Sequence, residues 1–313
     1  MQYFMNFTYL APKIIEMKLA LFGRKTDLSS LKSLNILIHK LKEYKNVELC
    51  CYSPFYDYIK GAFSKNDVLQ TFDSYKNLPH DTDIFLSLGG DGTFLESLTF
   101  IRGSGIPVAG INFGRLGFLT TAKVEGNNEW IEKLITGNYL TEERTLLSIK
   151  TETLEAMPKN FYHYALNEIT LQRRNPVMLE ISISVDGKNL PTYIADGVLI
   201  GSATGSTAYS LSIGGPIVTP DSKVLIIAPI APHNLNVRPI IVPETSVVAI
   251  SYESRGEEAL LTADNRYFVL PKGEKIVISK GEYALKCVSI NSCFIEALSQ
   301  KLLWGEDKRA MLK

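Results

Sequence analysis

The first third of the chain alternates short apolar runs with segments in which apolar residues recur at helical spacing. Leu31, Leu34, Ile38 and Leu41 mark one such helix, which we place at 28–44, and a second helix is expected at 93–101. The short apolar runs are expected strands at 19–23, 47–52, 83–88 and 107–111. Strands that alternate with helices in this way predict a Rossmann-like α/β domain with a parallel sheet.

After about residue 140 the pattern changes to strand-like runs that follow one another, with turn signals such as Asp186-Gly187 between them. Helical periodicity is scarce there, so we expect a second domain that is mainly antiparallel β. The expected strands are 146–151, 163–171, 179–185, 197–200, 223–227, 246–252, 259–262 and 274–279. An amphipathic stretch at 294–304 predicts a last helix that packs back on the first domain.

These patterns divide the chain into an α/β domain followed by a β domain. We place the α/β domain at 17–125, together with a C-terminal helix at 293–313, and the β-rich domain at 126–292. Residues 1–16 contain no basic stretch followed by a long apolar one, so they do not resemble a secretory signal. Because the first strand begins directly after Met17, we interpret 1–16 as a dispensable N-terminal extension.

Charge and cysteine usage narrow the kinds of ligand and the compartment. The 313 residues include 33 Lys and Arg and 33 Asp and Glu, so no basic surface for nucleic acid is indicated, and a local site must hold any anionic ligand. No apolar run is long enough to cross a bilayer, and we expect no membrane partner. Cys50, Cys51, Cys287 and Cys293 form no Cys-x-x-Cys pair, and we interpret them as reduced thiols of a cytoplasmic protein without a metal cluster.

A glycine-rich turn, Gly89-Gly90-Asp91-Gly92, joins an expected strand to an expected helix. Glycines let the backbone approach a ligand closely, and a helix start offers free N–H groups and partial positive charge to an anion. The turn lacks the P-loop lysine and does not fit Gly-x-Gly-x-x-Gly, so it is a different phosphate-binding design. Asp91 would repel a phosphate unless it held a hydroxyl or a metal. The alternative is that it only stabilises the turn or caps the helix.

The same turn occurs in 6-phosphofructokinases and in lipid kinases of the diacylglycerol and sphingosine type, so it indicates phosphoryl transfer and leaves the acceptor open. Three further segments narrow the choice. They are 110–119, Asn167-Glu168, and 196–212, which contains Thr204-Gly205-Ser206-Thr207-Ala208-Tyr209 and is followed by Gly214-Gly215-Pro216. Together with the turn, and in this order from about residue 17 to about residue 300, they resemble the NAD kinase family.

The resemblance implies a fold like that of NAD kinases and diacylglycerol kinases, with NAD bound between the two domains. It implies an enzyme that transfers a phosphoryl group from ATP, or from inorganic polyphosphate, to the 2′-hydroxyl of the adenosine ribose of NAD, which makes NADP. It also implies a divalent metal ion, Mg²⁺, that accompanies the nucleotide donor. Cytoplasmic location and assembly as a homodimer or homotetramer are further implications.

Asp91 would lie beside the 2′-hydroxyl, as a general base or as a group that orients the hydroxyl. An unperturbed aspartate has a pKa of about 3.9, far below that of a sugar hydroxyl, so we expect late proton acceptance rather than deprotonation before attack. Gly92 would leave room for the ligand beside the backbone, and we take Phe94 in the same segment as a binding candidate.

Asn167 can donate and accept hydrogen bonds, as an adenine edge requires, and Glu168 can accept from a ribose diol, although the pair alone could be a solvated strand end. Tyr209 could stack on a base or pack against the β domain. The resemblance places Asp196 at the nicotinamide end of NAD and His233 near the site, and either residue could instead be structural. The remaining binding candidates are Thr204, Thr207, Ala208, Ser210, Leu211 and Ser212.

One position departs from the family pattern. Many NAD kinases have Asp-Gly-Gln where this chain has Asp264-Asn265-Arg266. An arginine side chain cannot accept a hydrogen bond, so Arg266 would either meet a phosphate or face solvent. We retain Arg266 as a binding candidate.

Two other functions fit parts of the sequence. A lipid or sphingoid-base kinase shares the glycine-rich turn, but the chain has no basic amphipathic helix for a membrane surface. A non-catalytic NAD-binding sensor would have the same fold, but the presence of Asp91 favours an enzyme. An assay for NADP after mixing the protein with NAD, ATP and Mg²⁺ separates the three.

The interpretation of residues 1–16 is directly testable. Deleting them should leave the activity and the melting temperature nearly unchanged, because the first strand begins after Met17. A large loss of soluble protein on deletion would show that this segment packs on the fold.

Overall fold

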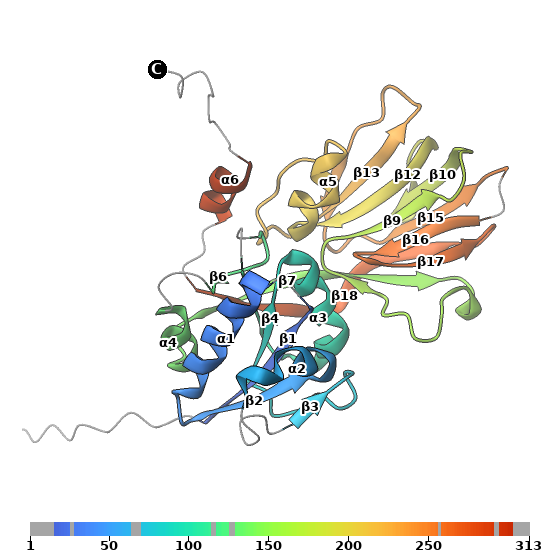
Figure 1. The fold of residues 1–313 in the computed structure, drawn as a ribbon. Coiled ribbons are helices and arrows are strands. Elements are labelled where there is room, and N and C mark those ends of the chain that lie inside the picture. Colours follow the sequence, from blue (N-terminus) through green and yellow to red (C-terminus); the bar gives the residue numbers. More distant parts are fainter. Residues whose placement is uncertain are drawn as a thin grey trace, which may run out of the picture.

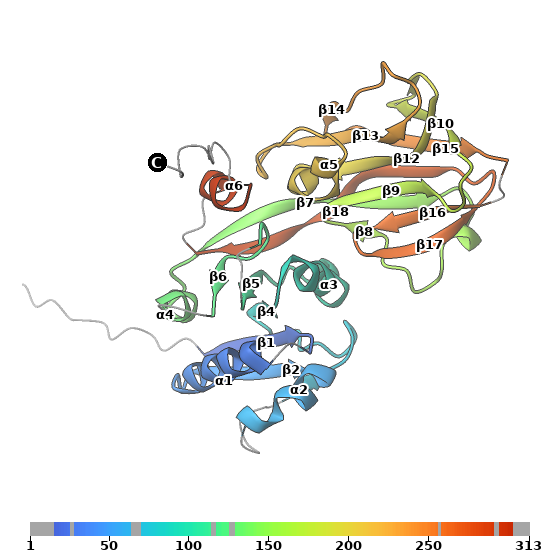
Figure 2. The same ribbon diagram turned by 45° about the horizontal axis from the view of Figure 1, so that its top comes forward.

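The structure is a computed structural model that describes residues 16–25, 28–63, 70–113, 117–124, 129–255, 258–290 and 294–302. Figures 1 and 2 show an α/β domain formed by the N-terminal third of the chain and a larger body of strands formed by the rest. Apart from Glu16, the expected extension at 1–16 lies outside the described residues.

The α/β domain is built on a parallel sheet. Its strands are β1 (Met17–Gly23), β2 (Val47–Tyr52), β3 (Gln70–Phe72), β4 (Ile84–Leu88), β5 (Val108–Asn112) and β6 (Ala122–Lys123). β1 pairs with β2 on one side and with β4 on the other, and β3 and β5 extend the sheet outward. The order β3-β2-β1-β4-β5 follows, with β6 beside the end of β5.

Helices cover both faces of this sheet, because successive side chains of a strand point to opposite sides. They are α1 (Leu28–Lys42), α2 (Ser53–Ile59), α3 (Asp91–Ile101) and α4 (Glu129–Ile135), with 3₁₀ turns η1 (Lys60–Ala62) and η2 (Arg102–Ser104). Leu19 and Leu21 of β1 pack with residues of α1, α2 and α4, whereas Ala20 and Phe22 pack with residues of α3. The strand is therefore apolar on both sides, as in a sheet buried between helices.

The β domain contains antiparallel pairs only, among its own described strands. Its strands are β7 (Leu140–Thr151), β8 (Tyr164–Ala165), β9 (Glu168–Arg173), β10 (Leu179–Val185), β11 (Lys188–Asn189), β12 (Tyr193–Ser202), β13 (Val224–Pro232), β14 (Ile240–Pro243), β15 (Val248–Glu253), β16 (Glu258–Ala263), β17 (Arg266–Pro271) and β18 (Ile276–Ser289). Short helical segments are η3 (Leu154–Ala156), η4 (Thr204–Thr207) and α5 (Tyr209–Ser212). β12 lies between β9 and β13, and alternate residues of these strands, such as Ile169 and Ile200, form one apolar core.

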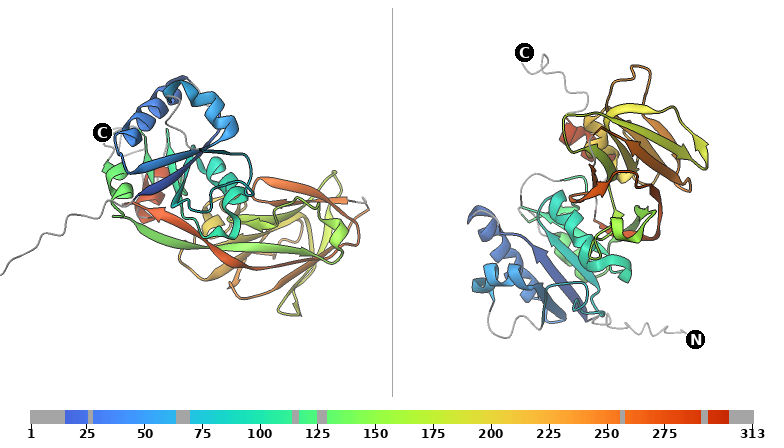
Figure 3. Two further views of the ribbon diagram at one scale, coloured as in Figure 1. Left: turned by 90° about the horizontal axis from the view of Figure 1, so that it is seen from below. Right: turned by 90° about the vertical axis from the view of Figure 1, so that its right-hand side faces the viewer.

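The long pair β7–β18 connects the two bodies. The two strands run antiparallel from the β domain to the edge of the first sheet (Figure 3). There, Cys287 of β18 pairs in parallel with Val108 of β5, so all described strands belong to one continuous sheet of eighteen. A continuous sheet holds the two domains in a fixed relation, and any site between them is shaped by this pair.

The run expected as one strand at 163–171 is two strands. β8 ends at Ala165 and β9 begins at Glu168. At the break, the backbone N–H groups of Leu166 and Asn167 donate to the carboxylate of Asp264 instead of to a neighbouring strand. The apolar pattern contains no signal for this break, because the donors are backbone groups and the acceptor is 97 residues further along the chain.

The last described element is the helix α6 (Phe294–Leu302), the expected C-terminal helix; its continuation beyond 302 lies outside the described residues. The Phe294 ring lies 6.3 Å from that of Phe118, so α6 meets the segment that follows β5. Within the described ranges, no helix is long and apolar enough to span a membrane. Cys50, Cys51 and Cys287 are buried free thiols, and Cys293 is outside those ranges.

Candidate active site

The glycine-rich turn lies between β4 and α3, and Asp91 is the first residue of the helix. Its carboxylate accepts the backbone N–H of Phe118 at 2.8 Å and that of Leu119 at 3.1 Å. A side chain at Gly117 would come within 1.8 Å of Asp91 Oδ1, so only glycine fits at that position. Asp91 thus links the turn to the 117–119 loop. A carboxylate has about four lone-pair sites, so it can still accept from a ligand hydroxyl.

Lys301 of α6 contacts the same loop. Its Nζ donates to the carbonyl oxygen of Gly117 and lies 4.1 Å from the centre of the Phe118 ring. Burial lowers the pKa of Lys301 to about 8, and the Asp91 carboxylate acts in the opposite direction. Sequence reasoning missed this residue, since a lysine in an amphipathic helix looks like part of a solvated face.

Asn167 and Glu168 occupy the break between β8 and β9. Both are buried, which does not fit the alternative of a solvated strand end. A side chain at Gly205 would come within 2.1 Å of the Asn167 carbonyl oxygen, so η4 packs directly on this break. The glycine of the Thr-Gly-Ser-Thr-Ala-Tyr segment therefore brings that segment against the Asn-Glu pair.

Glu168 is a buried carboxyl group with incomplete hydrogen bonding. The backbone N–H of Tyr209 donates to it, and its Oε2 has no partner in the described structure. Burial raises the pKa of Glu168 to about 8, the nearby Asp264 carboxylate contributes in the same direction, and the Tyr209 N–H opposes the shift. The unpartnered oxygen can accept a hydroxyl hydrogen from a ligand.

Solvent exposure varies along the segment 204–212. Thr204 and Ser210 are buried, Tyr209 is half-buried against apolar residues of β12 and β13, and Ser212 is exposed. Thr207, Ala208 and Leu211 are half-buried between them. One part of the Tyr209 side chain packs against the β domain. Its exposed part leaves room for contact with a ring of a ligand.

The other predicted residues lie in different surroundings. Asp196 is ion-paired with Arg173 at 3.0 Å between Nε and Oδ1, and His233 is exposed after β13. Gly92 is exposed at the start of α3. Phe94, only 1% exposed, lies in the core of the α/β domain, and its predicted contact with a ligand has no support in this arrangement.

Arg266 neither faces solvent nor lies open to a phosphate. Its guanidinium is largely buried; Nη2 donates to the Tyr164 carbonyl and lies 3.6 Å from Asp264 Oδ2. The planar group lies 5.1 Å from the centre of the Tyr162 ring. Direct contact between Arg266 and a substrate therefore stays a prediction without a visible route.

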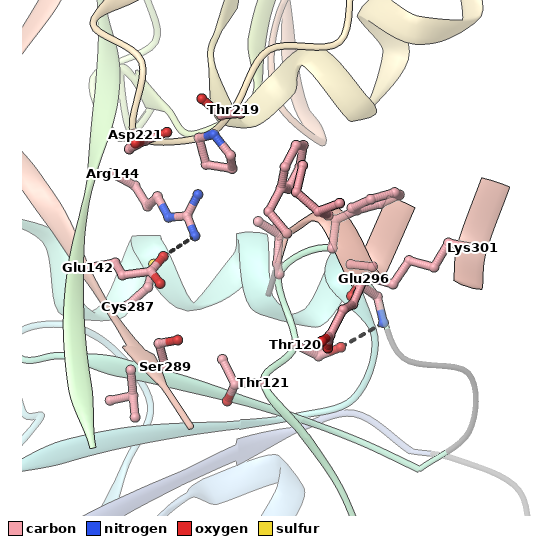
Figure 4. Close-up of a pocket in the computed structure, with 18 residues that line it drawn as sticks. Thr120, Thr121, Glu142, Arg144, Thr219, Asp221, Cys287, Ser289, Glu296 and Lys301 are labelled. Carbon is pink, nitrogen blue, oxygen red and sulfur yellow. Dashed lines mark hydrogen bonds and ion pairs between the residues drawn. The ribbon is translucent and has the colours of Figure 1, made fainter. Parts of the chain in front are cut away.

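A cavity of about 710 Å³ is lined by residues of the 117–121 loop, β7, β18 and α6 and by Thr219, Pro220 and Asp221 (Figure 4). It shares the 117–121 loop with Asp91, but no residue predicted for the site lines it. Its polar lining includes Arg144, which is paired with Glu142, together with Thr219 and Lys301. We centre the candidate site on the half-buried Asp91 and the buried Glu168, because acidic side chains with lone pairs left for a ligand identify a site better than empty volume does.

The side chains that could hold a metal ion are dispersed. In the part of the chain that the structure describes, no group of three or more His, Cys, Asp or Glu side chains is arranged to hold one. A metal ion that enters with a phosphorylated substrate would be held partly by the oxygens of that substrate.

An aspartate at a glycine-rich strand-to-helix turn, beside a second domain with a buried amide and carboxyl pair, defines a nucleotide-dependent phosphotransferase of two domains.

Family models for the ATP-NAD kinase N-terminal domain and the ATP-NAD kinase C-terminal domain match residues 37–139 and 166–290. The NAD kinase of Christiangramia forsetii is 37% identical over 298 residues, which cover 94% of this chain and all of that protein. The NAD kinase of Bacteroides fragilis is also 37% identical, over 297 residues, with the same coverage of both chains.

Solved structures agree with these matches. Yeast NADH kinase in complex with NADH superposes with a TM-score of 0.82 at 25% identity, covering 94% of this chain and 90% of that chain. An NAD kinase from Archaeoglobus fulgidus in complex with ATP has a TM-score of 0.69 at 26% identity, covering 92% and 99%.

The chain belongs to the NAD kinase family. The predicted fold class is confirmed, and the function is that of an NAD kinase; the lipid-kinase and sensor alternatives are not favoured.

The raised pKa of Glu168 predicts how stability depends on pH. The folded protein keeps this proton up to about pH 8, whereas the unfolded chain releases it near the ordinary value of 4.5. Between these values the folded state binds more protons, so the free energy of unfolding falls as the pH rises. Glu168→Gln has no proton to lose. As the pH rises from about 4.5 to about 8, the melting temperature of the unaltered protein should therefore fall relative to that of this variant. A difference that stays constant over this range would contradict the shifted pKa.

Proposed function

We propose that Asp91 orients the 2′-hydroxyl of the adenosine ribose of NAD and accepts its proton late, as the terminal phosphoryl group of ATP is transferred. The observation that carries this proposal is the position of the Asp91 carboxylate. It stands at the start of α3 and is fixed by two backbone N–H groups of the 117–119 loop. The two solved relatives, one with NADH and one with ATP, support the choice of substrates.

Phosphoryl transfer depends mainly on the alignment of the attacking hydroxyl with the phosphoryl group. A loose phosphoryl-transfer transition state involves little covalent work by the protein, so positioning and electrostatics dominate. The N-terminus of α3 offers partial positive charge to the phosphates, and Asp91 offers a lone pair to the attacking hydroxyl. A fixed carboxylate loses no conformational freedom when the hydroxyl arrives, which favours the aligned state.

Asn167 and Glu168 would bind the nucleoside part of NAD. The amide of Asn167 can match an adenine edge, and the unpartnered oxygen of Glu168 can accept from a ribose hydroxyl. Tyr209 would stack on a ring, while Thr204, Thr207, Ser210 and the backbone of 208–212 would supply polar contacts. These groups contact the ground state as well as the transition state, so they serve affinity more than turnover.

Further parts of the proposal rest on membership of the NAD kinase family. Mg²⁺ would arrive with the phosphates of the donor, since it usually keeps several waters and needs only one or two protein carboxylates. Inorganic polyphosphate is a second donor to be tested beside ATP. We also propose a cytoplasmic location, contact of Asp196 with the nicotinamide end of NAD, and a position of His233 near the site. The proposed domain division remains 17–125 and 126–292, with α4 of the second range packed on the sheet of the first domain.

Replacing Asp91 by Asn tests its role. The amide would keep the shape of the side chain and could still accept one of the two backbone N–H groups, but it would lose the charge that accepts the proton. We expect kcat to fall by ~10² to 10⁴ while the Kd for NAD changes little, because the charge acts mostly in the transition state. A purely structural Asp91 predicts near-normal turnover and a loss of stability of about 1 kcal/mol. Turnover within a few-fold of the parent would contradict the catalytic role.

Asp186→Asn is the matched control. The Asp186 carboxylate also accepts a backbone N–H, from Val247 at 2.8 Å, but it lies in the turn between β10 and β11 of the β domain. This variant should lower the melting temperature and leave kcat unchanged. If both variants lose the same fraction of activity, the effect belongs to folding and not to the chemistry.

Assembly is the remaining proposal. β14 pairs with β13 alone among the described strands, and Ile194, Leu235 and Ile241 expose apolar side chains near this edge. An edge strand with apolar neighbours is suited to pairing with a second copy. Light scattering on the purified protein should report a homodimer or homotetramer. A fully active monomer at the assay concentration would contradict this proposal.

A further inference from the structure

One carboxylate holds the whole break between β8 and β9. Asp264 Oδ2 accepts the N–H of Leu166 at 2.9 Å, and Oδ1 accepts those of Asn167 at 2.8 Å and Glu168 at 3.3 Å. The backbone N–H of Asp264 in turn donates to the Glu168 carbonyl at 2.9 Å. The side chain of Asp264 has no exposure to solvent, so these contacts replace its water.

Arg266 completes the arrangement from the same hairpin between β16 and β17. Its Nη2 reaches the Tyr164 carbonyl, which precedes the break, and lies 3.6 Å from Asp264 Oδ2. The guanidinium therefore bonds Tyr164 of β8 and neutralises the Asp264 carboxylate that holds the residues of the break. Its Nε and Nη1 are buried without a protein partner in the described structure, so they offer no surface to a substrate.

We propose that Arg266 and Asp264 are positioning residues that fix the backbone of Asn167 and Glu168 in the geometry that binds NAD. The inference rests on the proposed function of those two side chains. It assigns Arg266 an indirect role, through Tyr164 and Asp264. Because a one-residue slip would turn both side chains away from the ligand, a small loosening of the break is enough to weaken binding.

Charge explains why an arginine stands at this position. A fully buried carboxylate needs a counter-charge or several donors, and Asp264 has both. Burial raises the pKa of Asp264, while the guanidinium and the three N–H groups act in the opposite direction. A neutral side chain at 266 would leave the three N–H groups as the only compensation. The Tyr162 ring, whose centre lies 5.1 Å from the guanidinium, adds a surface on which the cation packs.

The test compares Arg266→Met, which removes the charge at similar length, with Arg266→Lys, which keeps it. Arg266→Met should raise KM and Kd for NAD about 10-fold with kcat within a few-fold, since loss of a charged hydrogen bond costs on the order of 1.4 kcal/mol. Arg266→Lys should recover part of the affinity. Asp264→Asn should lose more than Arg266→Met, because it places an N–H₂ group against backbone donors.

Glu274→Gln serves as the control for a general loss of stability. Glu274 is also a buried carboxylate that accepts a backbone N–H from a distant segment, that of Thr153 at 2.7 Å, together with the Thr153 hydroxyl at 2.9 Å. It lies outside the proposed site. This variant should lower the melting temperature and leave KM for NAD unchanged.

Hydrogen exchange gives a readout that does not depend on activity. The N–H groups of Leu166, Asn167 and Glu168 should exchange faster in Arg266→Met and in Asp264→Asn, and should not change in Glu274→Gln. Unchanged exchange there, or a normal KM for NAD in a folded Arg266→Met, would overturn the inference. If the unaltered protein made no NADP, the proposed function would fail, while the exchange result would still decide whether Arg266 and Asp264 hold the break.

Discussion

A carboxylate that is shielded from water, wholly as in Asp264 or partly as in Asp91, is met by N–H donors, and both halves of the candidate site show this. In the α/β domain, Asp91 accepts two N–H groups from the 117–119 loop. In the β domain, Asp264 accepts three from the break between β8 and β9. In each case a short polar side chain fixes a stretch of backbone that the sheet leaves unpaired.

The incomplete hydrogen bonding of the Glu168 side chain follows from this arrangement. Asp264 uses the backbone donors of the break, so the Glu168 side chain retains one N–H contact and one unpartnered oxygen. Burial leaves the group with a raised pKa, and a ligand hydroxyl would supply the missing partner. The β7–β18 pair keeps this carboxyl group in a fixed relation to Asp91, because it joins the two domains as one sheet.

Periodicity and turn residues predicted the fold well where local pattern decides it. β1, α1 and β2 lie within a few residues of their expected bounds, and the glycine-rich turn opens α3 as expected. The break at 166–167 and the contact of Lys301 with Gly117 could not be predicted, because each joins residues far apart in the chain. Likewise, the sequence presented Arg266 as exposed or ligand-binding, since nothing local indicates that Tyr162 and Asp264 enclose it.

In the proposed mechanism, the acceptor hydroxyl of NAD lies at Asp91, between the two domains. A crystal structure of the protein with NAD and a non-hydrolysable ATP analogue tests it most directly. The adenosine 2′-hydroxyl should lie about 2.6 to 3.2 Å from the Asp91 carboxylate, with Asn167 and Glu168 in contact with the same nucleoside. NAD bound instead in the cavity lined by Arg144, Thr219 and Lys301, with its 2′-hydroxyl out of reach of Asp91, would contradict it.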